Sequence, residues 1–425
     1  MRQQILLVLL AFAVMTSTCS RQQSEPGKVE AAETRTDAGD SEIKSALDLI
    51  DKTPDATDGY IRLASVYIRR ARETGDFSLN TKAETAVEKA LSISQNDISA
   101  RKLQASLHLT FHRFAEALEA GTALEKEFPS DAFVYGVLTD ANAELGNYDA
   151  AIKAAQKMVD LKPNAASYAR VAHIRSLVGD HRGAVEMFRT AADITDPKDH
   201  EARAWCLVQL GDEYWKHGQF DRSEKAYDES LSVLPDYYFA LAGKGRARAA
   251  VGDLRSAETF LRNSQDRVPN VETVIFLGDV YSALGNADAA KQQYDLVEVV
   301  EQKLGLNNDQ KRLALLWADH DLRLDDALTI AEREYSARKD IVTADTLAWC
   351  RFKKGDLAGA KTAVDAAMKL KTDDARTLYH AAMIYKQLGD RAQAKKMLET
   401  ALRINPSFDL VQSPIAQKEL ADLKK

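Results

Sequence analysis

The sequence predicts an all-α fold, a superhelical solenoid of antiparallel helix pairs. The first observation is a spacing of 34 residues between prolines, which occurs in two series: Pro129, Pro163 and Pro197, then Pro235 and Pro269. The second is a recurrent Gly-Asp or Gly-Asn turn, as in "LGNYDAA", "VGDHRGA" and "KGDLAGA". Glycine readily takes the left-handed conformation that ends a helix, and Asp or Asn suits the turn that follows. Self-similarity at such a period is the signature of a repeat architecture.

Residues 1–18 are predicted to be a signal peptide. Arg2 supplies a short positive region, and Ile5 to Met15 form an unbroken apolar run of eleven residues. A bilayer span needs about 20 apolar residues, so this run is too short to be one. It has the length of the apolar region of a secretory signal, and we therefore expect the chain to be exported.

The residues that follow, Thr16 to Cys19, resemble a bacterial lipoprotein signal. In that signal the cysteine is linked to diacylglycerol and becomes the mature N-terminus. Ser17 fits the pattern, whereas Thr16 stands where Leu is usual and Thr18 where Gly, Ala or Ser is usual. The resemblance implies a lipid anchor at Cys19 in the cell envelope. The alternative is cleavage after Ser20 by an ordinary signal peptidase, which would give a soluble periplasmic or secreted protein.

Residues 19–40 are predicted to be a flexible linker. From Ser20 to Asp40 there is one Val and no Leu, Ile, Phe, Tyr or Trp. Such a segment cannot bury enough apolar surface to offset the entropy of ordering it. It would tether a folded body to the membrane without fixing its orientation.

The repeat array is predicted over residues 41–412, with about ten units between Asp55 and Pro406. The first unit carries an insertion around "TGDFSLNTK", and the eighth, residues 307–339, is degenerate. Alanines repeat with the prolines, at 34 residues or close to it: Ala117, Ala151 and Ala184, Ala348 and Ala382, Ala360 and Ala394. Small residues allow paired helices to approach closely, and aromatic residues fill the space between neighbouring pairs.

This pattern resembles the tetratricopeptide repeat family, whose motif is Leu-Gly, Tyr, a spaced Ala-Phe-Ala and Pro. The matching residues are Leu210, Gly211, Tyr214, Tyr227 and Pro235; Leu277, Gly278, Tyr281, Ala290 and Tyr294; and Ala172, Ala184, Phe188, Ala191 and Pro197. The resemblance implies a solenoid whose concave face is lined by the first helix of each pair. Residues 413–425 would form the solvating C-terminal helix that such arrays need.

Composition and motifs argue against an enzyme or a nucleic-acid-binding protein. The net charge of −7 gives no reason, over the whole chain, to expect nucleic-acid binding. The charge is uneven, because residues 350–425 carry +6 and the remainder −13. No phosphate-binding loop and no Gly-x-Ser-x-Gly elbow occurs. The repeats leave no stretch of about 100 residues for a catalytic domain. We therefore predict no catalytic residue, no cofactor and no metal site.

Two histidine-containing segments are candidates for a metal site. His108 and His112 have the spacing of a zinc-protease helix but lack its glutamate and a third ligand. Asp319 and His320 are expected to face the inner surface, with His380 two repeats away. The alternative function is therefore an accessory ligand- or metal-binding protein that uses the Asp319–His320 region.

Cys206 and Cys350 are predicted to be buried thiols. They lie about four repeats apart, whereas a disulfide requires Cα atoms about 4.4–6.8 Å apart. In a continuous array they therefore cannot pair.

The predicted function is a non-enzymatic scaffold that binds peptides or helices of one or more partner proteins in the concave groove. Aromatic side chains make good anchors there, and arginine adds directional hydrogen bonds. The family register places the following residues on this face: Phe133, Trp205, Asp212, Trp215, Phe239, Arg246, Asp279, Asp345, Trp349 and Tyr379. The alternative for half of these residues is packing between repeats.

The lipid anchor predicts a specific mass for the mature protein in a membrane fraction of its native cell. We expect a chain that begins at Cys19 and carries diacylglycerol, measured by intact mass spectrometry. A chain that begins near Arg21 without lipid would contradict the anchor and leave a soluble exported protein. An uncleaved chain in the cytoplasm would contradict export itself.

Overall fold

A computed structural model describes residues 40–304 and 310–425. These residues form α-helices joined by short turns and loops, with no strand in either range, which confirms the predicted all-α fold. The signal peptide, Cys19 and the linker up to residue 39 lie outside the described residues.

Within the described ranges, a helix over residues 40–52 precedes ten antiparallel helix pairs, α2/α3 to α20/α21, and α22 follows them. The helices are α2 (Asp58–Thr74), α3 (Ser78–Ile93), α4 (Ile98–Thr110), α5 (Phe114–Glu127), α6 (Ala132–Glu144), α7 (Tyr148–Leu161), α8 (Ala165–Leu177), α9 (His181–Ile194), α10 (His200–Lys216), α11 (Phe220–Val233), α12 (Tyr238–Ala250), α13 (Leu254–Arg267), α14 (Val271–Ala283), α15 (Ala287–Leu304), α16 (Lys311–Asp319), α17 (Leu324–Ala337), α18 (Ile341–Lys353), α19 (Leu357–Ala367), α20 (Ala375–Gln387), α21 (Arg391–Ile404) and α22 (Gln412–Leu423).

In eight of the ten described pairs, a glycine with a positive φ lies in the turn between the two helices. In four pairs the glycine ends the first helix with a positive φ, and the aspartate that follows caps the second helix. The Asp180 carboxylate, for example, accepts a hydrogen bond from the Gly183 N–H at 2.9 Å. A cap of this kind stabilises a helix by about 1 kcal/mol. The capping aspartates are Asp180, Asp253, Asp356 and Asp390.

Small residues lie where the helices of a pair and of neighbouring pairs come closest. The seven alanines of the 34-residue spacing are all 0 % exposed. At Gly211, a Cβ atom would lie 2.5 Å from Cε1 of Tyr227, and at Gly278 one would lie 2.4 Å from Cε1 of Tyr294. Glycine at these two positions therefore makes room for the tyrosine of the following helix, which explains their pairing in the repeat motif.

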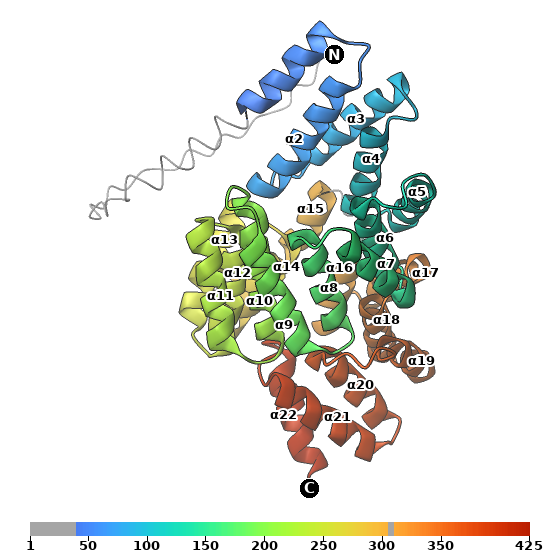
Figure 1. Cartoon of the computed structure of the whole chain (residues 1–425). Coiled ribbons are helices and arrows are strands. Elements are labelled where there is room, and N and C mark those ends of the chain that lie inside the picture. The colour runs from blue at the N-terminus through green and yellow to red at the C-terminus, as the bar shows by residue number, and fades with distance from the viewer. Residues whose placement is uncertain (1–39, 305–309) are drawn as a thin grey trace, which may run out of the picture.

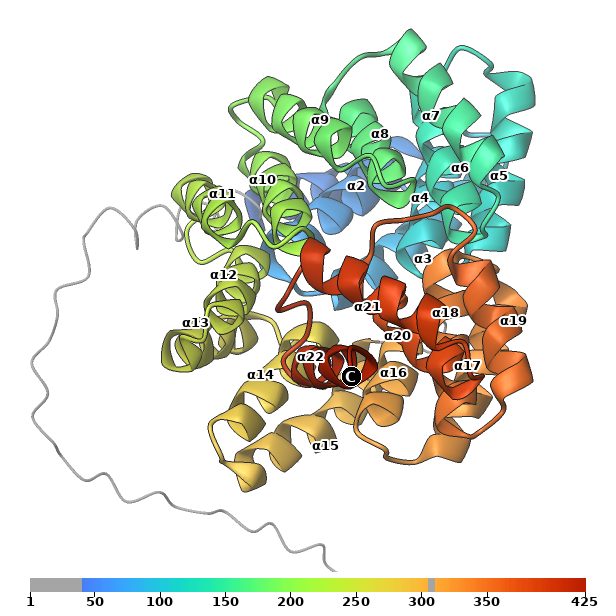
Figure 2. The same cartoon turned by 90° about the horizontal axis from the view of Figure 1, so that it is seen from below.

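Seen along the superhelix axis, the helix pairs form a ring (Figure 2). In the pairs from α4/α5 to α18/α19 the first helix lies nearer the middle of the ring and the second helix lies in its outer wall. In Figure 1 the N-terminal helices lie at the top and α20 to α22 at the bottom, so the chain advances along the axis as it turns.

Successive turns of the superhelix are in direct contact. The turn within a pair touches the loop between two pairs that follows much later in the chain: Gly75 lies against Val268, Gly146 against Lys339, Gly179 against Lys371 and Gly218 against Ile404. The closest approach to a backbone atom is at Gly146, where a Cβ atom would lie 2.4 Å from the Lys339 carbonyl oxygen.

Hydrogen bonds connect the same two turns. The Ile341 N–H donates to the Tyr148 hydroxyl at 2.8 Å, and the Asn405 amide donates to the Trp215 carbonyl at 2.8 Å. The Thr372 hydroxyl donates to the Leu177 carbonyl. These pairs are 190 to 195 residues apart, so one superhelical turn takes this length of chain.

The C-terminal segment covers the lower opening of the ring (Figures 1 and 2). The Asp409 carboxylate accepts hydrogen bonds from the N–H groups of Val411 and Gln412, both at 2.8 Å, and so orders the start of α22. The same carboxylate forms an ion pair with Arg376 at 2.8 Å. The last helix is thereby fixed to α20, inside the curve of the solenoid.

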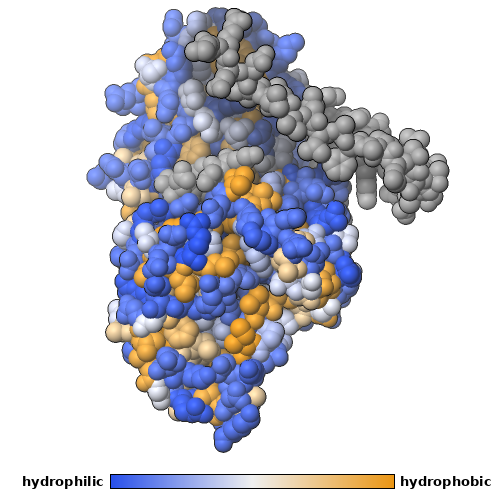
Figure 3. Space-filling model, turned by 180° about the vertical axis from the view of Figure 1, so that it is seen from behind, coloured by the Kyte–Doolittle hydropathy of each residue, from blue (hydrophilic) through white to orange (hydrophobic). Residues whose placement is uncertain are grey.

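The face seen in Figure 3 is mainly hydrophilic, with hydrophobic residues in several separate patches. No helix within the described ranges is both long enough and apolar enough to cross a bilayer.

Substitution of Gly146 by alanine tests the contact between turns. Gly146 and Gly285 both precede an asparagine and have nearly equal φ angles, 78° and 80°. A Cβ atom at Gly285 meets nothing within 4 Å, so Gly285→Ala introduces only backbone strain. We expect Gly146→Ala to lower the free energy of unfolding by about 1–3 kcal/mol more than Gly285→Ala, because it also overpacks the Lys339 backbone. Urea unfolding of both variants measures the difference, and equal losses would show that the turns do not rest on each other at this point.

Candidate binding groove in the superhelix interior

Two adjoining cavities lie inside the superhelix, with volumes of about 450 Å³ and 390 Å³. Seven residues line both of them, so the cavities form one groove, which we call the interior groove: Ser176, Trp215, Lys216, Arg246, Glu272, Phe276 and Arg312. Its walls come from the first helices of seven successive pairs, α8, α10, α12, α14, α16, α18 and α20. The C-terminal segment contributes Asn405, Phe408, Asp409 and Val411.

Six of the ten residues predicted for the groove line these cavities: Asp212, Trp215, Phe239, Arg246, Asp279 and Asp345. The other four lie elsewhere. Phe133 is 40 % exposed and lines a separate depression beside Met158, and Trp205 is 36 % exposed and lines neither cavity. Trp349 and Tyr379 are buried in the core, so they present no free surface to a partner. Trp349 stacks on His380, and the Tyr379 ring lies against Phe408.

Asp212 and Arg246 form the polar centre of the smaller cavity. One oxygen of Asp212 accepts a hydrogen bond from the Tyr227 hydroxyl at 2.6 Å and pairs with the Arg246 guanidinium. That guanidinium also lies 5.6 Å from the centre of the Trp215 ring. Burial alone would lower the pKa of Arg246, but Asp212 and its neighbours raise it, so Arg246 stays charged. The groove therefore holds a fixed cation against an aromatic wall.

The same arrangement recurs two pairs later in the chain. The Tyr294 hydroxyl donates to Oδ1 of Asp279 at 2.7 Å, as Tyr227 does to Asp212. His320 takes the position of the arginine, with its Nε2 atom 3.1 Å from the same oxygen. The Asp279–His320 pair lies in the wall of the larger cavity. Like Asp212, Asp279 also holds the tyrosine of its own pair in place.

Asp319 and His320, although adjacent in sequence, bind different partners. Oδ1 of Asp319 accepts hydrogen bonds from Trp349 Nε1 at 2.8 Å and from the Gln412 amide at 3.0 Å. His380, fully buried, lies 3.0 Å from the Asp345 carboxylate instead. Both Asp319 and His320 line the larger cavity, but within the described residues they do not form a group of metal ligands with His380.

Burial raises the pKa of Asp319 to about 6, and the nearby Asp409 carboxylate adds to the effect, while Arg376 and the two histidines oppose it. The cavity wall thus contains a carboxyl group that titrates close to neutral pH.

Cys206 and Cys350 are free and buried. Burial raises the pKa of each thiol to about 12, so neither is present as a thiolate at neutral pH.

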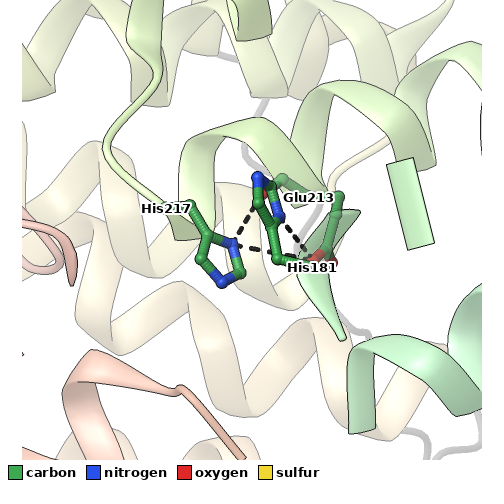
Figure 4. A group of neighbouring side chains, drawn as sticks. All are labelled: His181, Glu213 and His217. Carbon is green, nitrogen blue, oxygen red and sulfur yellow. Dashed lines mark hydrogen bonds and ion pairs between the residues drawn. The ribbon is translucent and has the colours of Figure 1, made fainter. Parts of the chain in front are cut away.

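A second cluster, which the sequence analysis did not identify, lies at the edge of the interior groove. It consists of His181, Glu213 and His217, and Figure 4 shows both imidazole rings beside the Glu213 carboxylate. Nδ1 of His181 lies 3.0 Å from Oε1 of Glu213, and Nδ1 of His217 lies 3.6 Å from the same oxygen. Glu213 and His217 are four residues apart on α10, a spacing visible in the sequence, but His181 comes from the preceding pair.

Sequence models described as tetratricopeptide repeats match residues 102–166 and 208–272, 163–236, and 375–408. Response regulator aspartate phosphatase J of Bacillus subtilis (strain 168) is 26 % identical over 130 residues, which cover 29 % of this chain and 35 % of that protein. The chain thus spans about a third of the length of this relative.

Three solved structures are similar at low identity. PilW, a type IV pilus biogenesis factor, is 21 % identical, with 47 % of this chain and 91 % of that chain covered and a TM-score of 0.39. The APC/C hetero-tetramer Cut9–Hcn1 is 15 % identical, with 93 % and 95 % covered and a TM-score of 0.35. A tetratricopeptide repeat protein from Parabacteroides merdae is 16 % identical, with 61 % and 99 % covered and a TM-score of 0.36.

The raised pKa of Asp319 predicts a pH-dependent stability. A carboxyl group whose pKa is raised on folding binds its proton more tightly in the folded chain, so the fold loses stability as the pH rises from about 4 to about 6. Asp319→Asn keeps an oxygen for Trp349 and Gln412 but cannot ionise. We expect the variant to gain about 2–3 kcal/mol over the parent protein across this range, with no further gain above pH 7.

Urea unfolding at several pH values measures this difference, and Asp48→Asn, on the exposed surface of the helix over residues 40–52, is the control. A difference between Asp319→Asn and the parent that stays constant from pH 4 to pH 8 would contradict the prediction.

Proposed function

We propose that this chain, which tetratricopeptide repeat models match over residues 102–272 and 375–408, is a non-enzymatic scaffold that binds segments of partner proteins in its interior groove. The observation that carries the proposal is the continuity of the groove across seven first helices. Repeat solenoids use such extended concave surfaces to bind peptides or helices of other proteins.

The groove offers the two kinds of contact that dominate protein interfaces. Trp215, Phe239 and Phe276 supply aromatic surface, and Arg246 is a charged donor already oriented by Asp212. Tryptophan, tyrosine and arginine are the commonest residues to carry binding energy at interfaces. Because the arginine is held in place before binding, a partner would lose less entropy when it engages it.

The composition of the walls favours a partner segment of mixed character. The larger cavity is lined by cations such as Lys311 and Arg376 and by acids such as Glu272, Asp345 and Asp374. A segment with a bulky apolar side chain and flanking charges of both signs would suit these walls better than a polyanion. This agrees with the net charge of −7 of the whole chain, and we propose no nucleic-acid partner.

We place this scaffold in the bacterial cell envelope, anchored to the membrane through a lipid at Cys19. The support is the apolar run of residues 5–15, the lipoprotein-like residues before Cys19 and the linker composition of residues 19–40. A tether of this kind lets the groove search for partners near the membrane.

A second candidate function is binding of a small ligand in the larger cavity. Its volume of about 450 Å³ falls within the range of about 300–1,000 Å³ typical of ligand pockets, and Asp319 and His320 both line it. A small ligand and a peptide would occupy the same walls. The crosslinking experiment below distinguishes the two functions.

Site-specific photo-crosslinking in the cell envelope tests the scaffold function. We expect a photoreactive phenylalanine analogue at Phe239, in the groove, to give discrete protein adducts. The same analogue at Phe260, on the outer helix α13 of the same pair, should give none. Arg246→Gln should weaken the adducts at position 239, because it removes the charged donor.

Adducts at position 260 but not at 239 would mean that partners bind the outer wall. No protein adduct at either position would favour the small-ligand function.

A further inference from the structure

The His181–Glu213–His217 cluster brings together three side chains of the type that bind transition metals. Glu213 and His217 lie one helical turn apart on α10, and His181 is the first residue of α9 in the preceding pair. One ligand atom from each residue lies within 4.8 Å of the other two. The Glu213 side chain is 1 % exposed, so its carboxylate faces the two rings and not bulk water.

The distances fit the space that a tetrahedral ion needs. With metal–ligand bonds of about 2.0–2.2 Å, ligand atoms around zinc lie about 3.3–3.6 Å apart. Oε1 of Glu213 lies 3.0 Å from Nδ1 of His181, slightly below this range, and 3.6 Å from Nδ1 of His217, at its upper end. The carboxylate oxygen is therefore already spaced from both rings as one ion would require.

Neighbouring residues hold the ligands from outside, as in known metal sites. The Ser176 hydroxyl donates to the second oxygen of Glu213 at 2.7 Å. The Gln219 side-chain amide lies 2.9 Å from Nε2 of His181 and so orients this ring through the nitrogen that faces away from Glu213.

We propose that His181, Glu213 and His217 form a binding site for a divalent transition-metal ion of the zinc type. The ion would replace the proton shared between Nδ1 of His181 and Oε1 of Glu213, and this proton would be released to water. The metal-free rings stack with their centres 3.6 Å apart, so one of them must turn for its nitrogen to point at the ion.

His217 has the fewer hydrogen bonds to give up in such a turn. Its Nδ1 lies 3.1 Å from the Glu213 carbonyl oxygen, and its Nε2 has no hydrogen-bond partner in the described part of the chain. Rotation about the bond to the imidazole ring is broad in energy for histidine. Three protein ligands leave a further coordination position, and Ser176, Lys216 and His217 line the larger cavity beside it. The ion would therefore be accessible from the interior groove.

Titration of the untagged, metal-stripped protein with Zn²⁺ against a chromophoric chelator tests the proposal. We expect one ion per chain with a micromolar or lower dissociation constant, and a thermal unfolding midpoint that rises with Zn²⁺. His181→Ala and Glu213→Gln should each weaken binding by at least about tenfold and abolish the rise in midpoint. His200→Ala, at the exposed start of α10, should change neither quantity.

Circular dichroism before titration verifies that each variant is folded. Failure of the parent protein to bind Zn²⁺ would overturn the proposal, and so would binding that survives both His181→Ala and Glu213→Gln. Because the readout involves no partner protein, this result is independent of the scaffold function.

Discussion

The contact between successive turns of the superhelix is the constraint on which the shape of this protein depends. In a solenoid whose pairs touch only their neighbours, the pitch depends on the small rotation between successive pairs alone. Here the turn at Gly146 rests on the backbone of Lys339, and the Tyr148 hydroxyl accepts a hydrogen bond from Ile341. These contacts set how far the chain advances in each turn. They also bring the C-terminal pairs beneath α8 and α10, so that the first helices of seven pairs enclose one groove.

The helix pairs could be predicted from the sequence because each depends on residues that are close together in the chain. The 34-residue spacing, the alanines that are fully buried and the aspartates that cap second helices all act within one or two pairs. The contacts between turns could not be predicted, because they join residues 190 to 195 positions apart. Their existence follows from small rotations summed over five to six pairs, which no single motif specifies.

The candidate site was predictable in part for the same reason. The repeat register placed Asp212, Trp215 and Arg246 on the inner face, where they are found, because a register needs only the local helical period. It did not distinguish an inner position from one covered by the next pair, and so it also selected Trp349 and Tyr379, which the following helices bury. The histidine cluster could not be predicted because its residues come from two pairs. Only the Glu213–His217 spacing is visible along one helix.

The stacked turns also have a mechanical meaning. The two ends of the described chain lie at opposite ends of the superhelix axis (Figure 1), so a pull on them acts along that axis. The load falls first on the few backbone contacts and hydrogen bonds between turns, such as those of Asn405 and Thr372. The helix pairs are held together by buried apolar clusters that extend over neighbouring pairs, so we expect them to yield later. We therefore expect tension along the axis to separate the stacked turns and widen the passage to the interior before any repeat unfolds.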